Sequence, residues 1–374
     1  MLPMKVGVIA AEMEGRPTGV GRYLEGLLGG IASWDHGIEW HLFFQGAPWQ
    51  GQPVGEGIVT HFSEDRGRRV MWEQVRLARE LSRHDLDVLF GPAYTLPFGV
   101  NLPSVVTIHD LSFEVLPRDF SLRERWRRRL LTRRAARVAD RVLADTGFIA
   151  EELAGRYAVP RNRLGVVPLG VDRERFTAER ENGGTKILAG LGVRRPYLLW
   201  VGTIFDRRLP HIVLEAFAAL RRRRPELQLV MGGANRMRHP KLFDQWVEDL
   251  ELGNAVLQLG WVEEDCLAPL YRGAELGFYL SRHEGFGIPP LECLACGTPV
   301  VVSTGLALDD AWPDYPLRCL RATAEEVAEK AETVLADPVG TARIIDEASA
   351  VVRFFDWETS SRRLVAELQK VVES

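Results

Sequence analysis

The 374-residue chain is poor in features that mark several classes of protein. It has only four cysteines, Cys266, Cys293, Cys296 and Cys319, all in its C-terminal half. Cys293 and Cys296 form a C-x2-C pair, but no second pair stands at zinc-site spacing, so we expect both to pack as small apolar residues. No apolar run approaches the roughly 18 residues of a membrane span, and no signal peptide is evident. We therefore expect a cytoplasmic protein with reduced thiols.

The chain also lacks a strong excess of charge of either sign. Its formal net charge is -4, which argues against a dedicated nucleic-acid binder. Hydrophobic residues make up 46% and charged residues 26%, as in an ordinary globular protein. The length suits two domains of about 180 residues each.

Apolar runs of strand length alternate with helical patterns in both halves. In the first half we expect strands at Val6–Ala11, Glu39–Phe44, Asp87–Phe90, Ser104–Ile108, Val142–Ala144 and Leu164–Pro168, with helices at Gly21–Ile31, Val70–Leu81 and Leu122–Asp140. In the second half we expect strands at Tyr197–Val201, Leu227–Met231, Val256–Leu259, Leu276–Leu280 and Val300–Val302. Repeated βαβ units predict an α/β protein with two Rossmann-like, doubly wound parallel-sheet domains and an interdomain cleft.

The domain boundaries follow from a polar stretch that ends near Asn182-Gly183-Gly184. We predict an N-terminal domain at residues 1–180, a C-terminal domain at 181–355, and a final amphipathic helix within 356–374.

The segment Ser281–Ser303, SRHEGFGIPPLECLACGTPVVVS, is the most informative part of the chain. Glu284 and Glu292 stand eight residues apart, on either side of a Gly-Phe-Gly turn and a proline pair. Apolar runs before and after predict a strand, a loop, a helix and another strand. Proline suits the first turn of a helix, and we expect Glu292 in that turn. The free amides of Leu291, Glu292 and Cys293 would then point into the preceding loop, because a helix that starts at the carboxyl edge of a parallel sheet is a ready phosphate site. With two carboxylates beside such a site, a nucleotide sugar is the ligand that the pattern describes.

This segment resembles the E-x7-E signature of retaining glycosyltransferases of the glycogen-synthase-like superfamily, most closely family 4, which has the GT-B fold. EGFG, the prolines, the helical glutamate and GTPVV all fall in register. Three further strings extend the resemblance: TGVGRY at Thr18–Tyr23, VTIHDL around His109, and WVGTIFDRRLP, which carries Arg207 and Arg208. The last string departs from the family, since Arg replaces Lys and Leu209 stands where Asn is usual.

The resemblance implies a site. His109 and Glu284 would hold the transferred sugar from opposite walls of the cleft, Glu292 the ribose, and Arg207 and Arg208 the diphosphate. The residues implied in donor binding are Gly19, Val20, Gly21, Gly202, Gly232, Trp261, Val262, Gly285, Phe286, Gly287, Ile288, Pro289, Leu291 and Glu292. The resemblance also implies that the final helix crosses back to the N-terminal domain, and that no metal or other cofactor is needed.

Two local motifs invite other readings. The G-x-G at Gly19–Gly21 is reminiscent of a dinucleotide site, but it lacks the third glycine and lies about eight residues beyond its strand. Asp85-Leu86-Asp87 is a D-x-D, as in metal-dependent sugar transferases, but its apolar run follows rather than precedes it. We interpret it as a turn at the entry of a strand.

The Arg-rich segment at residues 122–141 fits two interpretations. With Trp126 and Leu130 interleaved, it suits a basic helix that docks on anionic lipid. It equally suits a solvated helix paired in part with Glu124 and Asp140.

The sequence therefore predicts a retaining glycosyltransferase that moves a hexose or deoxyhexose, of mannosyl or rhamnosyl type, to a glycan, lipid-linked or natural-product acceptor. A glycoside phosphorylase of the same fold and a two-lobed sugar-binding protein are the alternatives. The expected partners are the donor and the acceptor, with no nucleic acid.

Overall fold

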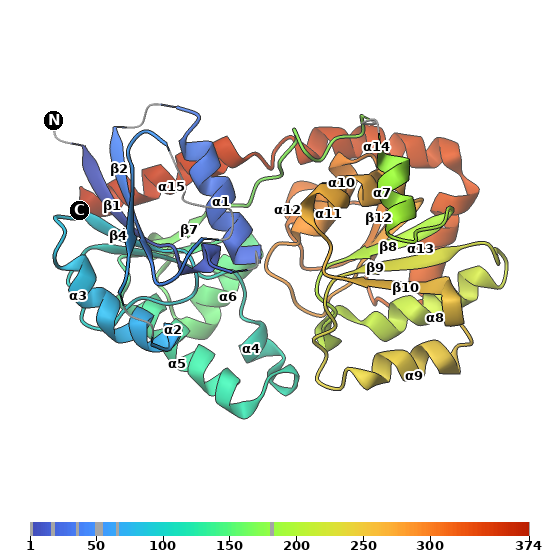
Figure 1. Ribbon diagram of the computed structural model, residues 1–374, viewed down its shortest axis with the longest axis horizontal. Helices are drawn as coiled ribbons and strands as arrows, with labels where there is room; N and C mark the ends of the chain where they lie inside the picture. Colours follow the sequence, from blue (N-terminus) through green and yellow to red (C-terminus); the bar gives the residue numbers. More distant parts are fainter. Residues whose placement is uncertain are drawn as a thin grey trace. The chain divides into compact units, whose positions relative to one another are not determined.

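The computed structural model describes residues 3–15, 19–34, 37–48, 55–64, 67–179 and 183–373. The chain forms two compact units. The first comprises Met1–Glu114, Ser121–Gly170 and Phe355–Ser374, and the second comprises Val115–Phe120 and Val171–Phe354. Each unit contains one parallel sheet flanked by helices, which confirms the predicted fold class (Figure 1).

The first unit is built on a sheet in the order β3-β2-β1-β4-β5-β6-β7. Its strands are β1 (Met4–Ile9), β2 (Ile38–Phe44), β3 (Ile58–Phe62), β4 (Val88–Gly91), β5 (Ser104–Thr107), β6 (Arg141–Ala144) and β7 (Leu164–Val166). Its helical segments are η1 (Ala11–Met13), α1 (Gly19–Ile31), α2 (Arg69–Met71), η2 (Trp72–Arg76), α3 (Leu77–Leu81), α4 (Ser112–Val115), α5 (Leu122–Val138), α6 (Gly147–Tyr157), η4 (Arg161–Arg163) and α15 (Trp357–Val372). A short segment, η3 (Pro117–Asp119), belongs to the second unit.

Burial explains which strands the sequence reveals. The strands β4 and β5 are buried throughout and read as continuous apolar runs, as expected for a sheet covered on both faces. The edge strand β3 is only partly buried along its length, and its polar Thr60 and His61 weaken the apolar pattern. For that reason β3 was not predicted. Helix α6, capped by the Thr146 hydroxyl, was also missed.

The C-terminal helix α15 packs against α1 within the first unit (Figure 1). Two glycines of α1 permit the close approach, because a Cβ at Gly26 would overlap the Trp357 ring and a Cβ at Gly30 would overlap the Trp357 carbonyl and the Ser361 hydroxyl. The Ser361 hydroxyl also donates to the Leu27 carbonyl at 2.8 Å. Small residues on α1 therefore determine how closely the last helix can pack.

The second unit is built on a sheet in the order β10-β9-β8-β11-β12-β13. Its strands are β8 (Tyr197–Val201), β9 (Gln228–Gly232), β10 (Val256–Gly260), β11 (Leu276–Tyr279), β12 (Val300–Ser303) and β13 (Arg318–Cys319). Its helical segments are α7 (Gly184–Gly190), η5 (Asp206–Arg208), α8 (Pro210–Arg221), α9 (Lys241–Asp249), η6 (Gly253–Ala255), α10 (Glu264–Gly273), α11 (Ile288–Ala295), α12 (Ala307–Ala311), α13 (Ala324–Ala336) and α14 (Pro338–Val352). Helix α8 packs against α9 and α13, whereas α10 packs against α7 and α11 against α14 (Figure 1).

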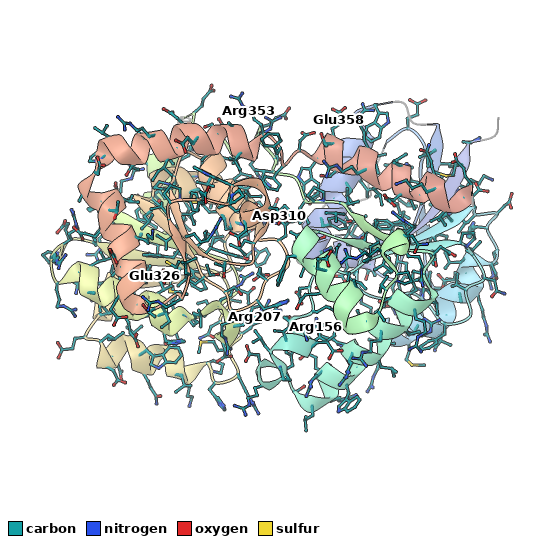
Figure 2. All side chains as sticks on the ribbon, turned by 180° about the vertical axis from the view of Figure 1, so that it is seen from behind. Arg156, Arg207, Asp310, Glu326, Arg353 and Glu358 are labelled. Atoms are coloured by element: carbon teal, nitrogen blue, oxygen red, sulfur yellow. The ribbon has the colours of Figure 1, made fainter. Side chains whose placement is uncertain are left out.

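Local polar contacts fix the end of this sheet. The Glu326 side chain, labelled in Figure 2, lies in the first turn of α13. Its carboxylate accepts hydrogen bonds from the backbone amides of Leu320, Arg321 and Ala322. These contacts hold the turn between β13 and α13. As predicted, Cys293 and Cys296 are buried as small side chains. Among the described residues, no helix is long and apolar enough to cross a membrane.

Candidate functional site

The carboxyl ends of three neighbouring strands in the second unit meet through glycine backbone. The amide of Gly202, after β8, donates to the carbonyl of Gly232, at the end of β9, at 2.8 Å. The amide of Gly233 donates to the carbonyl of Gly260, at the end of β10, at 2.6 Å. Gly233 has φ +144°, and a Cβ there would overlap the Gly202 carbonyl. Glycine is therefore required at Gly233, because the neighbouring backbone leaves no room for a Cβ. We call these strand ends the glycine edge. The predicted donor residues Trp261, 37% exposed, and Val262, buried, follow β10 directly.

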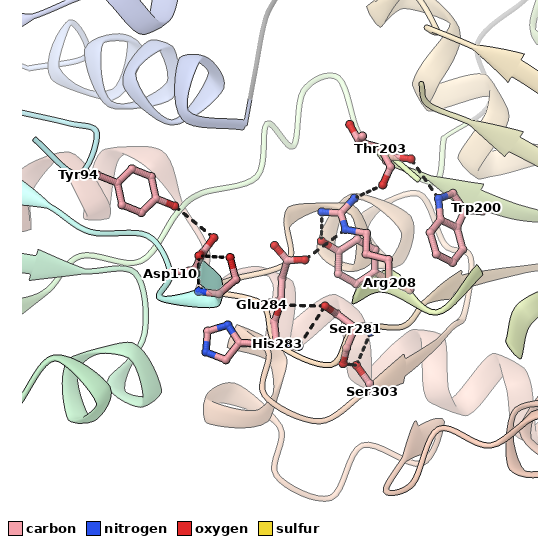
Figure 3. A network of polar contacts seen from close by, with 12 residues as sticks. Tyr94, Asp110, Trp200, Thr203, Arg208, Ser281, His283, Glu284 and Ser303 are labelled. Carbon is pink, nitrogen blue, oxygen red and sulfur yellow. Dashed lines mark hydrogen bonds and ion pairs between the residues drawn. The ribbon is translucent and has the colours of Figure 1, made fainter. Parts of the chain in front are cut away.

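Arg208 lies at the end of η5, beside this glycine edge, and holds polar contacts to several neighbours (Figure 3). Its Nε donates to Glu284 Oε2 at 3.2 Å, and its Nη2 donates to the Tyr279 hydroxyl at 2.9 Å. Its Nη1 donates to the Thr203 carbonyl at 3.3 Å. The Arg208 and Glu284 side chains are each 12% exposed, so water screens this ion pair only weakly. The structure thus brings together two residues that the sequence places 76 positions apart.

The loop that carries Glu284 is held by a pair of serines. The Ser281 amide donates to Ser303 Oγ at 2.9 Å, and Ser303 Oγ donates to the Ser281 carbonyl at 2.8 Å (Figure 3). Further along, the Phe286 carbonyl accepts from the Ala307 amide at 2.9 Å, and the Phe286 ring is buried. The loop is therefore anchored at both ends, which holds Glu284 near Arg208.

Helix α11 follows this loop and carries the second carboxylate of the E-x7-E pattern. It begins at Ile288, with Gly287 as its N-cap at φ +87° and Pro289 in its first turn. Glu292 therefore lies in the second turn, and the expectation of a first-turn acid is corrected. The reason is that the helix starts one residue before the proline pair. Leu291 is fully buried and packs in the core.

Glu292 is 3% exposed and accepts a hydrogen bond from the Tyr271 hydroxyl of α10 at 2.8 Å. Its role in holding ribose stays a prediction. The amides that α11 leaves free in its first turn are those of Gly287 and Ile288, because prolines have no N–H. The amides of Glu292 and Cys293 lie too far along the helix for the role that the sequence suggested.

Arg207, next to Arg208, has a different environment. Its guanidinium stacks on the Phe205 ring at 4.4 Å, and its Nε is buried with no hydrogen-bond acceptor among the described residues. A buried donor without an acceptor is costly, and an anionic ligand oxygen would satisfy it.

In the first unit, His109 follows β5 and both of its ring nitrogens have polar partners. Nδ1 lies 2.8 Å from Asp145 Oδ2, and Nε2 lies 2.8 Å from the Pro92 carbonyl. The Tyr23 ring meets the imidazole edge-on at 4.8 Å. His109 is 8% and Asp145 2% exposed. The ring is therefore fixed in orientation by residues from three separate parts of the unit.

These partners decide the protonation of His109. Because the Pro92 carbonyl can only accept, Nε2 carries a proton, and Nδ1 then shares a second proton with Asp145. Burial alone would lower the pKa of His109, but the Asp145 charge and hydrogen bond, with the Pro92 carbonyl, raise it overall. An imidazolium favoured in this way can interact with developing negative charge on a ligand.

Asp110, the residue after His109, is held in place by hydrogen bonds to its neighbours. Its Oδ1 accepts from the Ser112 amide at 2.8 Å, and its Oδ2 accepts from the Tyr94 hydroxyl at 3.2 Å (Figure 3). Sequence reasoning missed Asp145 and Tyr94 as neighbours of His109. Asp145 left a signal, because it directly follows β6 as His109 follows β5, and neighbouring parallel strands end at the same edge.

The predicted Gly19, Val20 and Gly21 form the first residues of α1, and Thr18 lies outside the described residues. A Cβ at Gly19 would meet no atom within 4 Å, so the space beside it is open. The D-x-D motif lies before β4, where Asp87 accepts a hydrogen bond from the Lys5 amide at 2.7 Å. Asp87 therefore stands at the entry of its strand, as expected.

Comparisons with known proteins place both halves in one group. The model "Glycosyltransferase Family 4" matches residues 17–175, and the model "Glycosyl transferases group 1" matches residues 189–350. A "D-inositol 3-phosphate glycosyltransferase" of Actinosynnema mirum is 32% identical over 237 residues, which are 61% of this chain and 57% of that relative. One from Salinispora arenicola is 35% identical over 177 residues, 44% of this chain and 40% of the relative.

Solved structures show the same fold over the full chain. Sucrose-phosphate synthase from Thermosynechococcus elongatus has a TM-score of 0.79 at 18% identity and covers 99% of both chains. HepE from Anabaena, solved with UDP and glucose, has a TM-score of 0.75 at 18% identity and covers 98% of this chain and all of its own. At such identity the likeness concerns the fold alone.

Proposed function

Because the chain belongs to the family 4 glycosyltransferases of the GT-B fold, we propose that it is a retaining, metal-independent hexosyltransferase. Its donor is a nucleotide-diphosphate sugar, with a hexose or deoxyhexose of mannosyl or rhamnosyl type. The observation that carries this proposal is the Arg208–Glu284 pair beside the glycine edge of the second sheet. A cation next to a carboxylate suits a ligand that is anionic at one end and hydroxylated at the other.

The reaction needs negative charge to be stabilised as the sugar leaves. When the bond between the anomeric carbon and the diphosphate breaks, charge develops on the phosphate oxygens. Arg207, with its unsatisfied Nε, and Arg208 are positioned to neutralise that charge in place of a metal. The acceptor oxygen then bonds to the same face of the anomeric carbon, and its proton passes to the departing phosphate.

Glu284 and His109 are proposed to hold the transferred sugar. Glu284 offers carboxylate oxygens to sugar hydroxyls. His109 acts on the sugar through the positive charge of its ring, because Asp145 and the Pro92 carbonyl hold both of its nitrogens. Replacing either by Ala should reduce transfer strongly while leaving affinity for the bare nucleoside diphosphate nearly unchanged. Equal loss of nucleotide affinity and transfer in both variants would remove them from the sugar site.

For the acceptor we propose a hydroxylated molecule that binds after β1 and β4 in the first unit. A small hollow lies there, lined in part by Glu12, Arg69, Glu73 and Thr95. Arg69 donates to Glu12 at 2.6 Å, and the Thr95 hydroxyl donates to Glu73. Such groups suit a ligand with several hydroxyls and one anionic substituent. The relatives named for inositol 3-phosphate support a phosphorylated polyol as an acceptor class, in addition to glycan, lipid-linked and natural-product acceptors.

The donor can be tested by its effect on stability. A ligand that binds the folded state should stabilise it by about 2.7 kcal/mol at a hundredfold excess over its dissociation constant. A thermal-shift screen of UDP, GDP, dTDP and ADP should single out one nucleotide. If none shifts the transition of the wild-type protein, the proposed donor site is wrong.

Association with the inner face of a membrane is proposed for α5. Leu122, Trp126 and Leu130 recur every four residues on this helix and are 73%, 63% and 66% exposed. Arginines surround this stripe. Arg128 pairs with Glu124, and Arg129 and Arg133 pair with Glu114. Asp140 instead accepts a hydrogen bond from the Ser104 amide. An apolar stripe between arginines suits an anionic lipid surface.

Vesicle sedimentation tests this docking. The protein should sediment with phosphatidylglycerol vesicles but not with phosphatidylcholine vesicles, and Trp126→Ala should weaken the binding. Phe354→Ala is the matched control, because Phe354 is equally exposed (72%) but lies outside α5. Binding that is equal in the two variants would refute the role of this stripe.

A further inference from the structure

Three of the eight histidines of the chain lie together in the first unit, away from His109. They are His41 on β2, His61 on β3 and His84 in the turn after α3. One ring nitrogen of each lies within 4.8 Å of those of the other two. The sheet order places β1 and β4 between this cluster and β5, the strand that precedes His109. Neither the proposed transfer reaction nor the donor site uses these side chains.

The strand register creates the cluster. In the parallel pair of β2 and β3, Phe43 lies opposite His61, and His41 stands two residues earlier on the same face of β2. The His61 ring stacks on Phe43 at 4.6 Å, and Phe43 meets His84 edge-on at 5.3 Å. The aromatic ring therefore shields the imidazoles from water on one side.

The hydrogen bonds of His41 define which nitrogen is available. Its Nε2 lies 2.8 Å from Glu39 Oε1, so Nε2 carries the proton and Nδ1 has a free lone pair. That Nδ1 lies 2.9 Å from His61 Nε2, which must therefore donate a proton to it. A carboxylate behind one imidazole is the arrangement that orients histidines which bind metals.

We propose that His41, His61 and His84 form a zinc site, with His41 Nδ1 as one ligand and Glu39 as the residue that orients its ring. Zinc binds imidazole nitrogen at about 2.0–2.1 Å, so nitrogens in a tetrahedral site lie about 3.4 Å apart. The measured distances, 2.9 Å for one pair and at most 4.8 Å for the others, need only small side-chain movements to reach this value. The ion would take the place of the proton between His41 and His61, and a water molecule would complete the tetrahedron.

The position of the site indicates a structural role. The strand β3 is at the edge of its sheet, and His61 is its only link to the cluster. A metal bound by β2, β3 and the turn after α3 would fix the edge strand to the helix that precedes β4. Zinc should therefore stabilise the first unit, while transfer per folded molecule should not depend on it.

The test is metal binding by the tag-free full-length protein after treatment with a chelator and its removal. Wild-type protein should take up one equivalent of Zn²⁺, measured by mass spectrometry of the metal content, and its thermal transition should rise. Co²⁺ at the same site should give the visible absorption of a tetrahedral complex. His61→Gln and His84→Gln should each lose these effects, whereas His239→Gln, a change at an exposed histidine elsewhere, should keep them.

Glu39→Gln gives a milder variant that keeps all three imidazoles. It should still bind one equivalent, with affinity lowered about 10- to 100-fold. Circular dichroism and nucleotide binding should be unchanged in the variants, which separates loss of the site from loss of folding. The proposal is overturned if wild-type protein binds zinc no more tightly than the His61→Gln/His84→Gln double variant, or if Glu39→Gln binds as tightly as wild type.

Discussion

Replacing Arg208 by Met removes the cation at the centre of the proposed donor site while nearly keeping the volume of the side chain. Glu284 and the Tyr279 hydroxyl then lose a partner in surroundings that admit little water. Removing one partner of a buried ion pair costs about 3–5 kcal/mol, and since both side chains keep 12% exposure we expect about 3 kcal/mol. Turnover should fall roughly 10²- to 10³-fold, as when one group that stabilises transition-state charge is removed.

The matched control is Arg224→Met in the same unit. Arg224 pairs with Glu332 at 3.2 Å, but these side chains are 30% and 29% exposed, so the loss should be about 1 kcal/mol or less with full activity. Urea unfolding gives the stability, and the transition that shifts when nucleotide is added reports the second unit. Adding Glu284→Gln to Arg208→Met should restore part of the stability but none of the turnover.

Two outcomes would refute this reasoning. One is an Arg208→Met protein that unfolds like Arg224→Met and turns over donor like wild type. The other is an Arg208→Met/Glu284→Gln protein that regains activity together with stability, because the arginine would then act only by supporting the fold.

Three further predictions concern the rest of the site. Glu292→Gln should weaken nucleoside diphosphate binding by about 1.5–3 kcal/mol. Tyr271→Phe removes the hydrogen bond between Tyr271 and Glu292 and should leave nucleotide binding unchanged. Equal effects of the two variants in calorimetry would make Glu292 a structural residue. His109 should titrate by NMR above its usual pKa of about 6.5, and Asp145→Asn should lower that midpoint. Because the pKa of His109 is raised in the folded protein, the charged His109–Asp145 pair stabilises the protein below pH about 6.5. This contribution is lost as the pH rises through the folded-state pKa of His109. A His109 titration midpoint at or below 6.5 would contradict the geometry. Transfer should survive EDTA, since arginines take the place of a metal, and a strict requirement for Mg²⁺ or Mn²⁺ would return attention to Asp85 and Asp87.

The sequence predicted most of the fold because buried parallel strands leave continuous apolar runs. The strand predicted at Tyr197–Val201 coincides with β8, and the final helix predicted within 356–374 is α15. The prediction failed at β3, whose partial burial breaks the apolar pattern, and at β13, which has only two residues. Short or half-exposed elements depend on their neighbours, which a linear pattern does not contain.

The site could be predicted only where its residues share one motif or follow one strand. The E-x7-E segment predicted that Glu284 lies on a loop. Its contact with Arg208 could not be predicted, because it depends on how β8 and β11 pair in the sheet. The His109–Asp145 pair likewise depends on the neighbouring β5 and β6. The histidine cluster left no local motif at all, because its members lie on β2, β3 and a turn. Its detection required the register of the sheet.

The central claim, transfer from a nucleotide-diphosphate sugar without a metal, is tested most directly by nucleotide release. Purified protein is incubated in EDTA with a panel of UDP-, GDP-, dTDP- and ADP-sugars, and released nucleoside diphosphate is measured by chromatography. We expect that at least one donor is consumed, and that Arg208→Met loses this activity while Arg224→Met keeps it. If every nucleotide sugar stays intact and sugar phosphate is released from a glycan in the presence of inorganic phosphate, the proposed transferase activity is contradicted and the protein is a phosphorylase. Sugar binding without any turnover would instead indicate a binding protein.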